Sequence, residues 1–352
     1  MISLLRLCGV CVPGPSLCPV RGFCPARITE HMDPVSELRA RRLIAQGLSP
    51  SAAAPTLDSP AAVTRHLLAL QGQTYPAGIR AIALRCSGDD AAVLAAVDRH
   101  EVVRGWPQRG TLHFLSAEDV RWMMRLCSPR IARSAAGHWA GLGLDADLVA
   151  TARRAFHDEL RARDLHDPLP RPVAYEVFAA AGVDPTEGRG PHLLRLFGGE
   201  GEVVQGPKIG AKETFLHVDQ LPVPQLKITG DEALAELATR YIRSHGPVSM
   251  KDLVWWSALT VAQAKKAFGL AQGVIGFGDE HLMADWQADV TPAELRAALD
   301  RDYELPAFDE ILLGYGDKSL ILPDEHRPRV LTKNGLSWPF RMSGGMVVGR
   351  VE

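Results

Sequence analysis

The sequence predicts a mainly α-helical fold with small β-hairpins, an α+β class built from tandem winged helix-turn-helix units. Its 352 residues exceed what one core usually accommodates and suggest two or three units of about 150 residues each. Hydrophobic residues make up 46% of the chain, which is ample core material. Helical periodicity recurs along the chain, and pairs of expected helices are followed by short alternating segments with Gly and Pro turns. Helices followed by a small hairpin are typical of a winged helix.

The first 31 residues differ from the rest. They contain Cys8, Cys11, Cys18 and Cys24 and four prolines, without periodicity. The spacing of the first two cysteines invites a zinc interpretation, but the other spacings fit no standard site. Prolines also interrupt the apolar run that a secretory signal would need. We therefore expect residues 1–31 to be disordered or to precede the true start, which would be Met32.

The number of cysteines and the hydropathy of the chain indicate in which cellular compartment the protein is expected. Beyond residue 31 only Cys86 and Cys127 remain, as is typical of a reducing compartment. No run approaches the roughly 18 apolar residues that a membrane helix requires. The sequence therefore predicts a cytoplasmic protein that does not associate with membranes.

The expected units differ in charge. We place a first winged-helix unit at 32–166, a second at 167–224, a third at 225–306 and a β-rich segment at 307–352. The net charge of −2 argues against a general nucleic-acid binder. Residues 32–135, however, hold 13 Lys and Arg against 9 Asp and Glu, whereas residues 136–352 hold 23 against 31. The first unit is the one suited to meet phosphate.

Local signals define the elements of the first unit. The expected order is a helix over 35–45, a helix over 59–70, a short strand over 79–85, a helix over 89–99 and a hairpin over 102–115. Ser59 and Pro60 form a good helix start. Pro76 disfavours helical geometry at Tyr75 and is expected to stop the second helix.

The later units repeat this architecture without repeating its sequence. The second is expected to have helices over 173–181 and 191–197 and two strands within 201–219, around a Gly/Pro/Lys tip. That tip lacks the Gly-Lys-Ser/Thr ending of a nucleotide loop. The third has helices over 231–244, 248–257 and 259–270 and a wing over 273–286. It is the clearest helix-turn-helix, but its surroundings are not basic, so packing is at least as good an interpretation as DNA contact.

Two glutamines follow the apolar helix of the first unit. If the chain is extended at Gln71-Gly72-Gln73, both amides point to one side. Glutamines at a helix end are usually solvated surface, and this alternative stays open on the sequence alone.

Three segments together carry a resemblance: residues 67–76 with the two glutamines, the expected hairpin over 102–115, and Phe308-Asp309-Glu310 with the residues up to Tyr315. In this order and at these separations they resemble the AlkZ/YcaQ-type DNA glycosylases, a family of tandem winged-helix proteins. The resemblance runs from about residue 35 to the last residue. It implies an enzyme that breaks the bond between a damaged base and its sugar.

The resemblance also implies site residues. The glutamines of the family's Gln-x-Gln motif sit at the lesion, which makes Gln71 and Gln73 the expected catalytic residues. Gly72 departs from the usual apolar middle residue, which is expected to loosen the backbone. Related sequences with Gln-x-Asp have a carboxylate base that is missing here. Family members usually continue with another strand and helix, so the sequence is a fragment or its last unit is less stable.

Other candidates surround these glutamines. Arg104 and Arg109 flank the expected hairpin turn and are the best phosphate contacts, with solvated wing charges as the alternative. We expect His113 to be a core or supporting histidine sooner than a catalytic one. Trp106 could wedge against a base, although packing is the safer interpretation.

The two carboxylates near the end of the chain are a weaker candidate for catalysis. Asp309 and Glu310 are adjacent, and adjacent residues in a strand point to opposite faces, so an acid/base couple is not expected, although Asp309 could still support the site. Nothing in the sequence resembles a metal site, and no cofactor is expected.

The expected function is excision of N7-alkylguanine lesions, including bulky adducts or interstrand crosslinks, in base excision repair or genotoxin resistance. The expected partner is double-stranded DNA with alkylated purines, bound by a monomer associated with the nucleoid. Two alternatives remain: a non-catalytic winged-helix DNA-binding protein or transcriptional regulator, and a drug-sequestering or structural protein.

Overall fold

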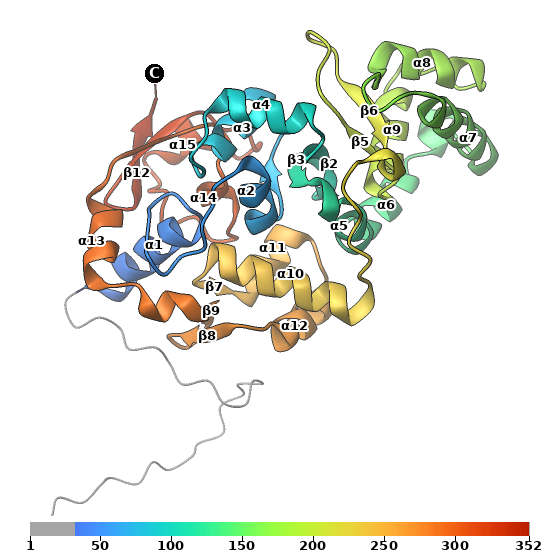
Figure 1. Cartoon of the computed structure of the whole chain (residues 1–352). Helices are drawn as coiled ribbons and strands as arrows, with labels where there is room; N and C mark the ends of the chain where they lie inside the picture. Colours follow the sequence, from blue (N-terminus) through green and yellow to red (C-terminus); the bar gives the residue numbers. More distant parts are fainter. Residues whose placement is uncertain (1–31, 352) are drawn as a thin grey trace, which may run out of the picture.

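The computed structural model describes residues 32–351, so the expectations for residues 1–31 lie outside the described part of the chain. Helices and small antiparallel sheets alternate along the chain, in agreement with the predicted α+β class. Figure 1 shows a larger body that contains both the first helix and the C-terminal sheet, and a smaller lobe of helices beside it.

A six-stranded antiparallel sheet joins the first two predicted units, with strand order β1-β3-β2-β5-β6-β4. Its strands are β1 (Leu70–Gln71), β2 (Val102–Gln108), β3 (Thr111–Ser116), β4 (Leu169–Pro170), β5 (Val203–Gln205) and β6 (Thr214–His217). The two hairpins meet where Arg104 of β2 lies opposite Gln205 of β5. Residues about a hundred positions apart therefore share one sheet.

Six helices surround the first half of this sheet: α1 (Pro34–Ala45), α2 (Pro60–Leu67), α3 (Tyr75–Ala83), α4 (Asp90–Asp98), α5 (Val120–Cys127) and α6 (Pro129–Ala136). The side chain of Ser59 accepts an N–H group in the first turn of α2, as predicted, and Asp89 does the same for α4. The hairpin of β2 and β3 closes through Arg109 and Gly110, which both adopt positive φ. This is the two-residue turn whose twist matches paired strands.

Two expectations for the first unit are wrong. The second helix ends at Leu67, before the glutamines, and Leu70 and Gln71 pair with β3 as a strand. The expected strand over 79–85 belongs to the helix α3, in which Pro76 occupies the first turn. Proline is tolerated there because the first N–H groups of a helix have no partner in any case. Ile79 and Ile82 then reach one core from one helical face.

The second unit forms the smaller lobe in Figure 1. Its helices are α8 (Arg171–Ala180) and α9 (Arg189–Gly199), together with α7 (Ala146–Ala162), which the predicted boundary at residue 166 had placed in the first unit but which packs against α8 and β6. Phe156, Phe178, Phe197 and Phe215 bring their rings together in a core between these helices and the sheet. The lobe is thus held by aromatic packing against β6.

The third unit contains the order of elements that the sequence predicted. These are α10 (Gly230–His245), β7 (Val248–Ser249), α11 (Met250–Ser257), α12 (Val261–Leu270), β8 (Val274–Phe277) and β9 (His281–Ala284), with sheet order β7-β9-β8. Reciprocal caps start α11 at Ser249 and α12 at Thr260. Helix α13 (Pro292–Asp300) follows and packs against α1.

The last segment is partly β, as expected. It contains α14 (Glu310–Leu313), α15 (Arg327–Val330), β11 (Phe340–Ser343) and β12 (Met346–Arg350). The strand β10 (Tyr303–Leu305), at the end of the predicted third unit, joins it in a sheet of order β10-β11-β12. The strand assumed at Asp309 and Glu310 is wrong, because Asp309 caps the short helix α14. This helix contacts β1, which brings the last segment under the glutamine strand.

The largest core crosses the predicted boundaries. It joins Leu43 of α1, Met124 of α5, Tyr241 of α10, Trp256 of α11 and Tyr315 after α14. The first unit, the third unit and the C-terminal segment therefore share buried surface.

Candidate functional site

Gln71 and Gln73 lie together at the edge of the six-stranded sheet. The Gln73 N–H donates to Gln71 Oε1 over 2.8 Å, and Gln71 Nε2 donates to Gln73 Oε1 over 3.3 Å. Gln71 is 8% exposed, whereas Gln73 is exposed. The two amides do point to one side, as an extended chain requires. Within the described residues, no protein group bonds to Gln73 Nε2.

Gly72 is held firmly between the two glutamines. Its N–H donates to the carbonyl of Leu112 over 2.8 Å, and the residue is buried. A Cβ on Gly72 would lie 3.1 Å from the Phe114 ring and 3.3 Å from the His113 backbone. The loosening expected at Gly72 is therefore wrong for this backbone, because the pairing with β3 and the Phe114 ring fix it.

His113 lies opposite Gln71 in the register of β1 and β3, so both side chains share one face of the sheet. Its Nδ1 bonds to the carbonyl of Thr111 over 2.9 Å, which makes Nδ1 the donor and Nε2 the acceptor. Arg109 donates to that Nε2 over 3.3 Å. Burial, reinforced by Arg109, lowers the pKa of His113 to about 3. The ring is neutral near pH 7 and both its nitrogens are occupied.

Arg109 links the hairpin turn to α11. Its Nη1 donates to the carbonyl of Trp256, and its guanidinium lies 4.8 Å from the ring centroid of Trp255. Lys318 stacks on the same indole at 3.7 Å. Burial lowers the pKa of Arg109. Arg109 is not a solvated wing charge.

Arg104 lies on the other face of the sheet, beside Tyr75. It is 4% exposed, and its Nη2 donates to Glu213 Oε1 over 3.2 Å. Arg171 donates to the second oxygen of the same carboxylate. The Tyr75 ring centroid is 5.4 Å from the Arg104 guanidinium and 4.6 Å from Lys208 Nζ. Arg104 therefore shares the Glu213 carboxylate with Arg171 and the Tyr75 ring with Lys208, and the solvated alternative is wrong for it too.

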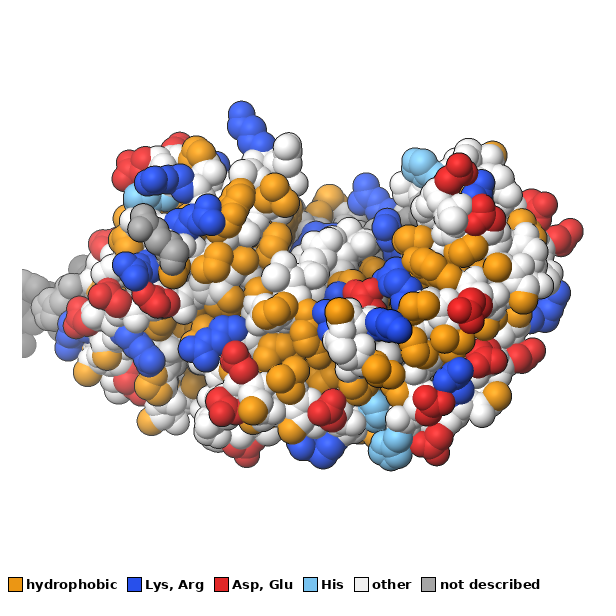
Figure 2. Space-filling model, turned by 90° about the horizontal axis from the view of Figure 1, so that it is seen from above, with side chains coloured by type: hydrophobic (Ala, Val, Ile, Leu, Met, Phe, Trp, Pro, Cys, Tyr) orange, Lys and Arg blue, Asp and Glu red, His pale blue; other side chains and the backbone are white. Residues whose placement is uncertain are grey.

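The hairpin of β5 and β6 rises at the top of Figure 1, on the face that Figure 2 views from above. Figure 2 shows a hollow in this face between two raised parts of the molecule. Lys and Arg side chains gather in the hollow around an acidic group.

Asp309 and Glu310 are both buried and have separate partners. Arg85 forms two bonds to the carboxylate of Asp309, of 2.8 and 2.7 Å, and both side chains are fully buried. Trp256 Nε1 donates to Glu310 Oε1 over 2.6 Å, and His245 Nε2 lies 3.2 Å from the same oxygen. The two carboxylates are not a couple, as expected, although the reason is their separate partners.

Trp106 packs away from the glutamines. It belongs to the phenylalanine core of the second unit, and a Cβ on Gly198 would lie 2.2 Å from its ring. Ser128 donates to the Trp106 carbonyl over 2.7 Å. The packing interpretation of Trp106 agrees with this position.

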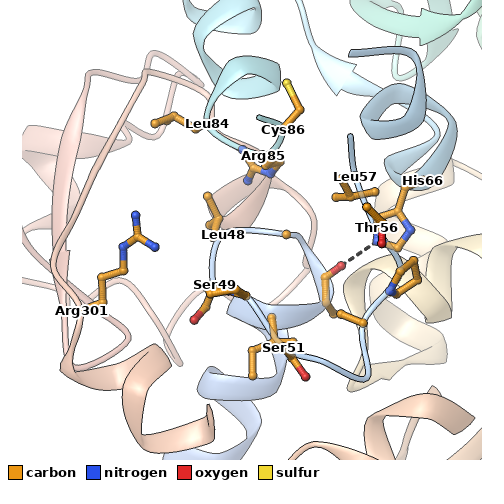
Figure 3. A pocket seen from close by; sticks show the side chains of 16 residues that line it. Leu48, Ser49, Ser51, Thr56, Leu57, His66, Leu84, Arg85, Cys86 and Arg301 are labelled. Atoms are coloured by element: carbon orange, nitrogen blue, oxygen red, sulfur yellow. Dashed lines mark hydrogen bonds between the residues drawn. The ribbon is translucent and has the colours of Figure 1, made fainter. Parts of the chain in front are cut away.

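A pocket of about 410 Å³ lies between the loop after α1, the end of α3 and His66. Figure 3 shows Arg301 on one side of this pocket and His66 and Cys86 on the other. His66 bonds to the carbonyl of Ala45 over 2.7 Å. None of the predicted catalytic or DNA-binding residues lines this pocket.

Residues 32–351 contain no group of three or more His, Cys, Asp and Glu arranged to hold a metal ion. In the same range, no helix combines the length and the apolar character that crossing a membrane would take.

Sequence reasoning did not select Tyr75, Glu213 and Trp255, which contact Arg104 or Arg109, nor Arg171 and Lys208, which contact Glu213 and Tyr75. One signal was available for Tyr75, which follows Gln73 by two positions. Lys208 stood in the tip considered only as a nucleotide loop. Nothing in the sequence pairs Arg171 and Glu213 with Arg104.

Comparisons with known proteins agree with the resemblance noted in the sequence. The profile of the family described as DNA glycosylase AlkZ-like matches residues 64–352. The Streptomyces sahachiroi DNA glycosylase AlkZ is similar in structure, with a TM-score of 0.71 and 23% sequence identity over 90% of this chain and 87% of that chain. A comparison with curated protein sequences finds no match. The solved structure therefore supports a shared fold, and the profile match covers most of the chain.

Proposed function

Since the chain belongs to the AlkZ-like DNA glycosylase family, we propose that it excises N7-alkylguanine from double-stranded DNA, with Gln71 and Gln73 at the lesion. The substrates include bulky adducts and interstrand crosslinks, and the role is base excision repair or genotoxin resistance. The protein acts as a monofunctional glycosylase and as a monomer on nucleoid DNA, with its helical units arranged as tandem winged helices.

The observation that supports this proposal most directly is that Gln71 and Gln73 are hydrogen-bonded to each other at the edge of the sheet. Gln71 is fixed by the β1–β3 pairing and by its bond to the Gln73 N–H. Gln73 is exposed, and its Nε2 has no protein partner within residues 32–351. An amide offers both donors and an acceptor, so this pair can hold a water and contact a base edge or phosphate. Its geometry is set before DNA arrives.

The chemistry needs little more than this. Alkylation at N7 places a positive charge on guanine, and breaking the glycosidic bond returns the bonding electron pair to the base, which leaves as a neutral molecule. The sugar carries the positive charge until water adds to C1′ and loses a proton to solvent. The amides orient that water and stabilise the developing charge by their dipoles. The product is an abasic site.

The surrounding groups do not supply a strong base. Burial keeps the pKa of His113 at about 3, and Arg109 occupies its acceptor nitrogen. Arg85 neutralises Asp309 in the interior. General-base assistance is worth roughly 10²- to 10⁴-fold, so a site without it favours leaving groups that are already activated. These features support cationic N7-alkylpurines over neutral lesions.

Phosphate contact by the first unit is part of the proposal. Arg104 and Arg109 are the DNA-binding residues we propose, one on each face of the sheet. In the free protein Arg104 bonds to Glu213 and Arg109 to Trp256 and His113. Contact with DNA therefore requires each arginine to exchange a protein partner for a phosphate.

The test is a set of otherwise identical duplexes that carry N7-methylguanine, a bulky N7 adduct, uracil or 8-oxoguanine. Base release is scored by strand cleavage at the abasic site. We expect release of both N7 adducts and none of uracil or 8-oxoguanine. Uracil release as fast as that of N7-methylguanine would show that a strong base exists elsewhere. Binding to all duplexes without any release would favour a non-catalytic DNA-binding protein or regulator.

A further inference from the structure

Two arginines bond to one carboxylate, and a lysine lies close by on the ring of Tyr75. Glu213 lies on the hairpin between β5 and β6 and accepts bonds from Arg104 and from Arg171. Lys208 of the same hairpin stacks on Tyr75, as Arg104 also does. The cluster thus carries three positive charges against one negative charge, in a protein whose overall net charge is −2.

The floor of this cluster has unused polar atoms. Arg104 Nε is buried without a hydrogen-bond partner among the described residues, and so are both amide atoms of Gln205. Arg104 and Gln205 are register partners on β2 and β5, so their side chains share one face of the sheet. Their exposed fractions are 4% and 2%. Buried polar groups normally have partners, so these atoms point to a ligand.

The position of the cluster relates it to the lesion site. Tyr75 begins α3 and follows Gln73 by two residues. Its ring contacts Phe114 edge to face, with centroids 5.4 Å apart, on the side of the sheet that carries Arg104. A group bound between Arg104 and Lys208 would therefore contact the residue two positions after Gln73, on the face of the sheet opposite Gln71.

We propose that Arg104, Arg171 and Lys208 form a binding site for a DNA phosphodiester around Tyr75, on the face of the sheet opposite Gln71, and that Glu213 occupies this site in the free protein. This inference rests on the proposed action on DNA and names a contact that the reaction would use. A phosphodiester has two anionic oxygens and accepts the same paired bonds from guanidinium groups as a carboxylate does.

The hairpin allows this exchange. The Glu213 side chain is 23% exposed, and Lys208 to Lys212 at the tip are exposed. Burial lowers the pKa of Arg104, so its charge needs an anion nearby, and Glu213 or a phosphate can provide it. Displacing Glu213 opposes DNA binding, because its bonds to the two arginines must break first.

The experiment compares the whole chain with Glu213→Gln for binding to an undamaged duplex over a series of salt concentrations. Glutamine removes the charge but keeps an acceptor for the arginines. We expect Glu213→Gln to tighten binding at least about threefold and to steepen the salt dependence by roughly one unit of slope. Glu176→Gln, an exposed site on α8 with the same change of charge, is the matched control and should change binding less than twofold.

Two more variants test the cations. Lys208→Ala changes an exposed residue and should weaken binding at least about threefold without lowering the melting temperature. Arg171→Ala should also weaken binding, and adding Glu213→Gln to it should give a smaller gain than in the native chain. Inorganic phosphate at constant ionic strength should leave these differences unchanged.

Equal affinity and salt slope for Glu213→Gln and Glu176→Gln would overturn the inference, even if alkylated bases were still released. Loss of the Glu213→Gln gain in inorganic phosphate would also overturn it, since the site would then take free phosphate. If the gain appeared but no base were released from any lesion duplex, the phosphodiester site would stand and the proposed function would fail.

Discussion

At the residue scale, Gln71 and Gln73 differ in how much of the fold depends on them. Gln71 is buried and its Oε1 accepts the backbone N–H of Gln73, whereas Gln73 extends to the surface. The sequence alone allowed both glutamines to be solvated surface residues at a helix end. Gln73 is exposed, in partial agreement with that alternative, whereas Gln71 is buried. The Gln71 side chain holds the backbone at Gln73 in place, and the Gln73 side chain is exposed and can contact a ligand.

We expect Gln73→Ala to change the free energy of unfolding by no more than about 0.5 kcal/mol, because an exposed side chain loses little on truncation. Gln71→Ala should cost about 1 kcal/mol, the usual value of one hydrogen bond. Each should lower the rate of base release at least tenfold, measured as single-turnover cleavage of an N7-methylguanine duplex.

Gln272→Ala, at an exposed amide far along the chain, is the control and should alter neither stability nor rate. If the variants at Gln71 and Gln73 retained the native rate while folded, the assignment of these glutamines to the lesion would be wrong. Thermal unfolding of each variant separates that result from loss of the fold.

At the element scale, the short helix α14 fixes the strand that carries Gln71. Helix α14 contacts β1, and its cap residue Asp309 is paired with Arg85 from just after α3. Arg85 in turn donates to the Gln46 carbonyl over 3.0 Å. Segments from the beginning, the middle and the end of the chain thus meet at one buried guanidinium.

Asp309→Ala should therefore destabilise the protein by about 3 to 5 kcal/mol, because it leaves the Arg85 guanidinium buried and unpaired. The measurement is chemical unfolding followed by circular dichroism. The exposed pair of Glu304 and Arg341 provides the comparison, and Glu304→Ala should cost at most about 1 kcal/mol. Similar small losses for both variants would mean that the Arg85–Asp309 pair contributes little to the fold.

At the scale of the whole molecule, buried histidines make stability depend on pH. Burial lowers the pKa of His66 to about 4 and that of His113 to about 3, from 6.5 in the unfolded chain. Between these values the unfolded chain binds protons that the folded chain does not. The stabilisation is therefore complete above pH 6.5 and is lost as the pH falls toward 4.

We expect a lower melting temperature at pH 5 than at pH 7.5 at equal ionic strength. His66→Gln removes one of the histidines whose pKa burial lowers, so the difference between the two pH values should become smaller in that variant. Calorimetry on the intact chain measures both. Equal melting temperatures at the two pH values would contradict the burial of neutral histidines.

The sequence by itself determined the helix caps, the hairpin turns and the glutamine motif with its family resemblance. These depend on local energies: Ser59 accepts a nearby N–H group, and Arg109-Gly110 supplies the turn that β2 and β3 require. Tertiary structure decided the conformation of segments for which local energies favour neither helix nor strand. Residues 79–83 suit either strand or helix, and packing against Phe114 and its neighbours favoured the helix. The partners of each buried arginine are distant in sequence, as Glu213 is from Arg104 and Trp256 is from Arg109, because a buried guanidinium needs groups that satisfy its charge and its N–H donors.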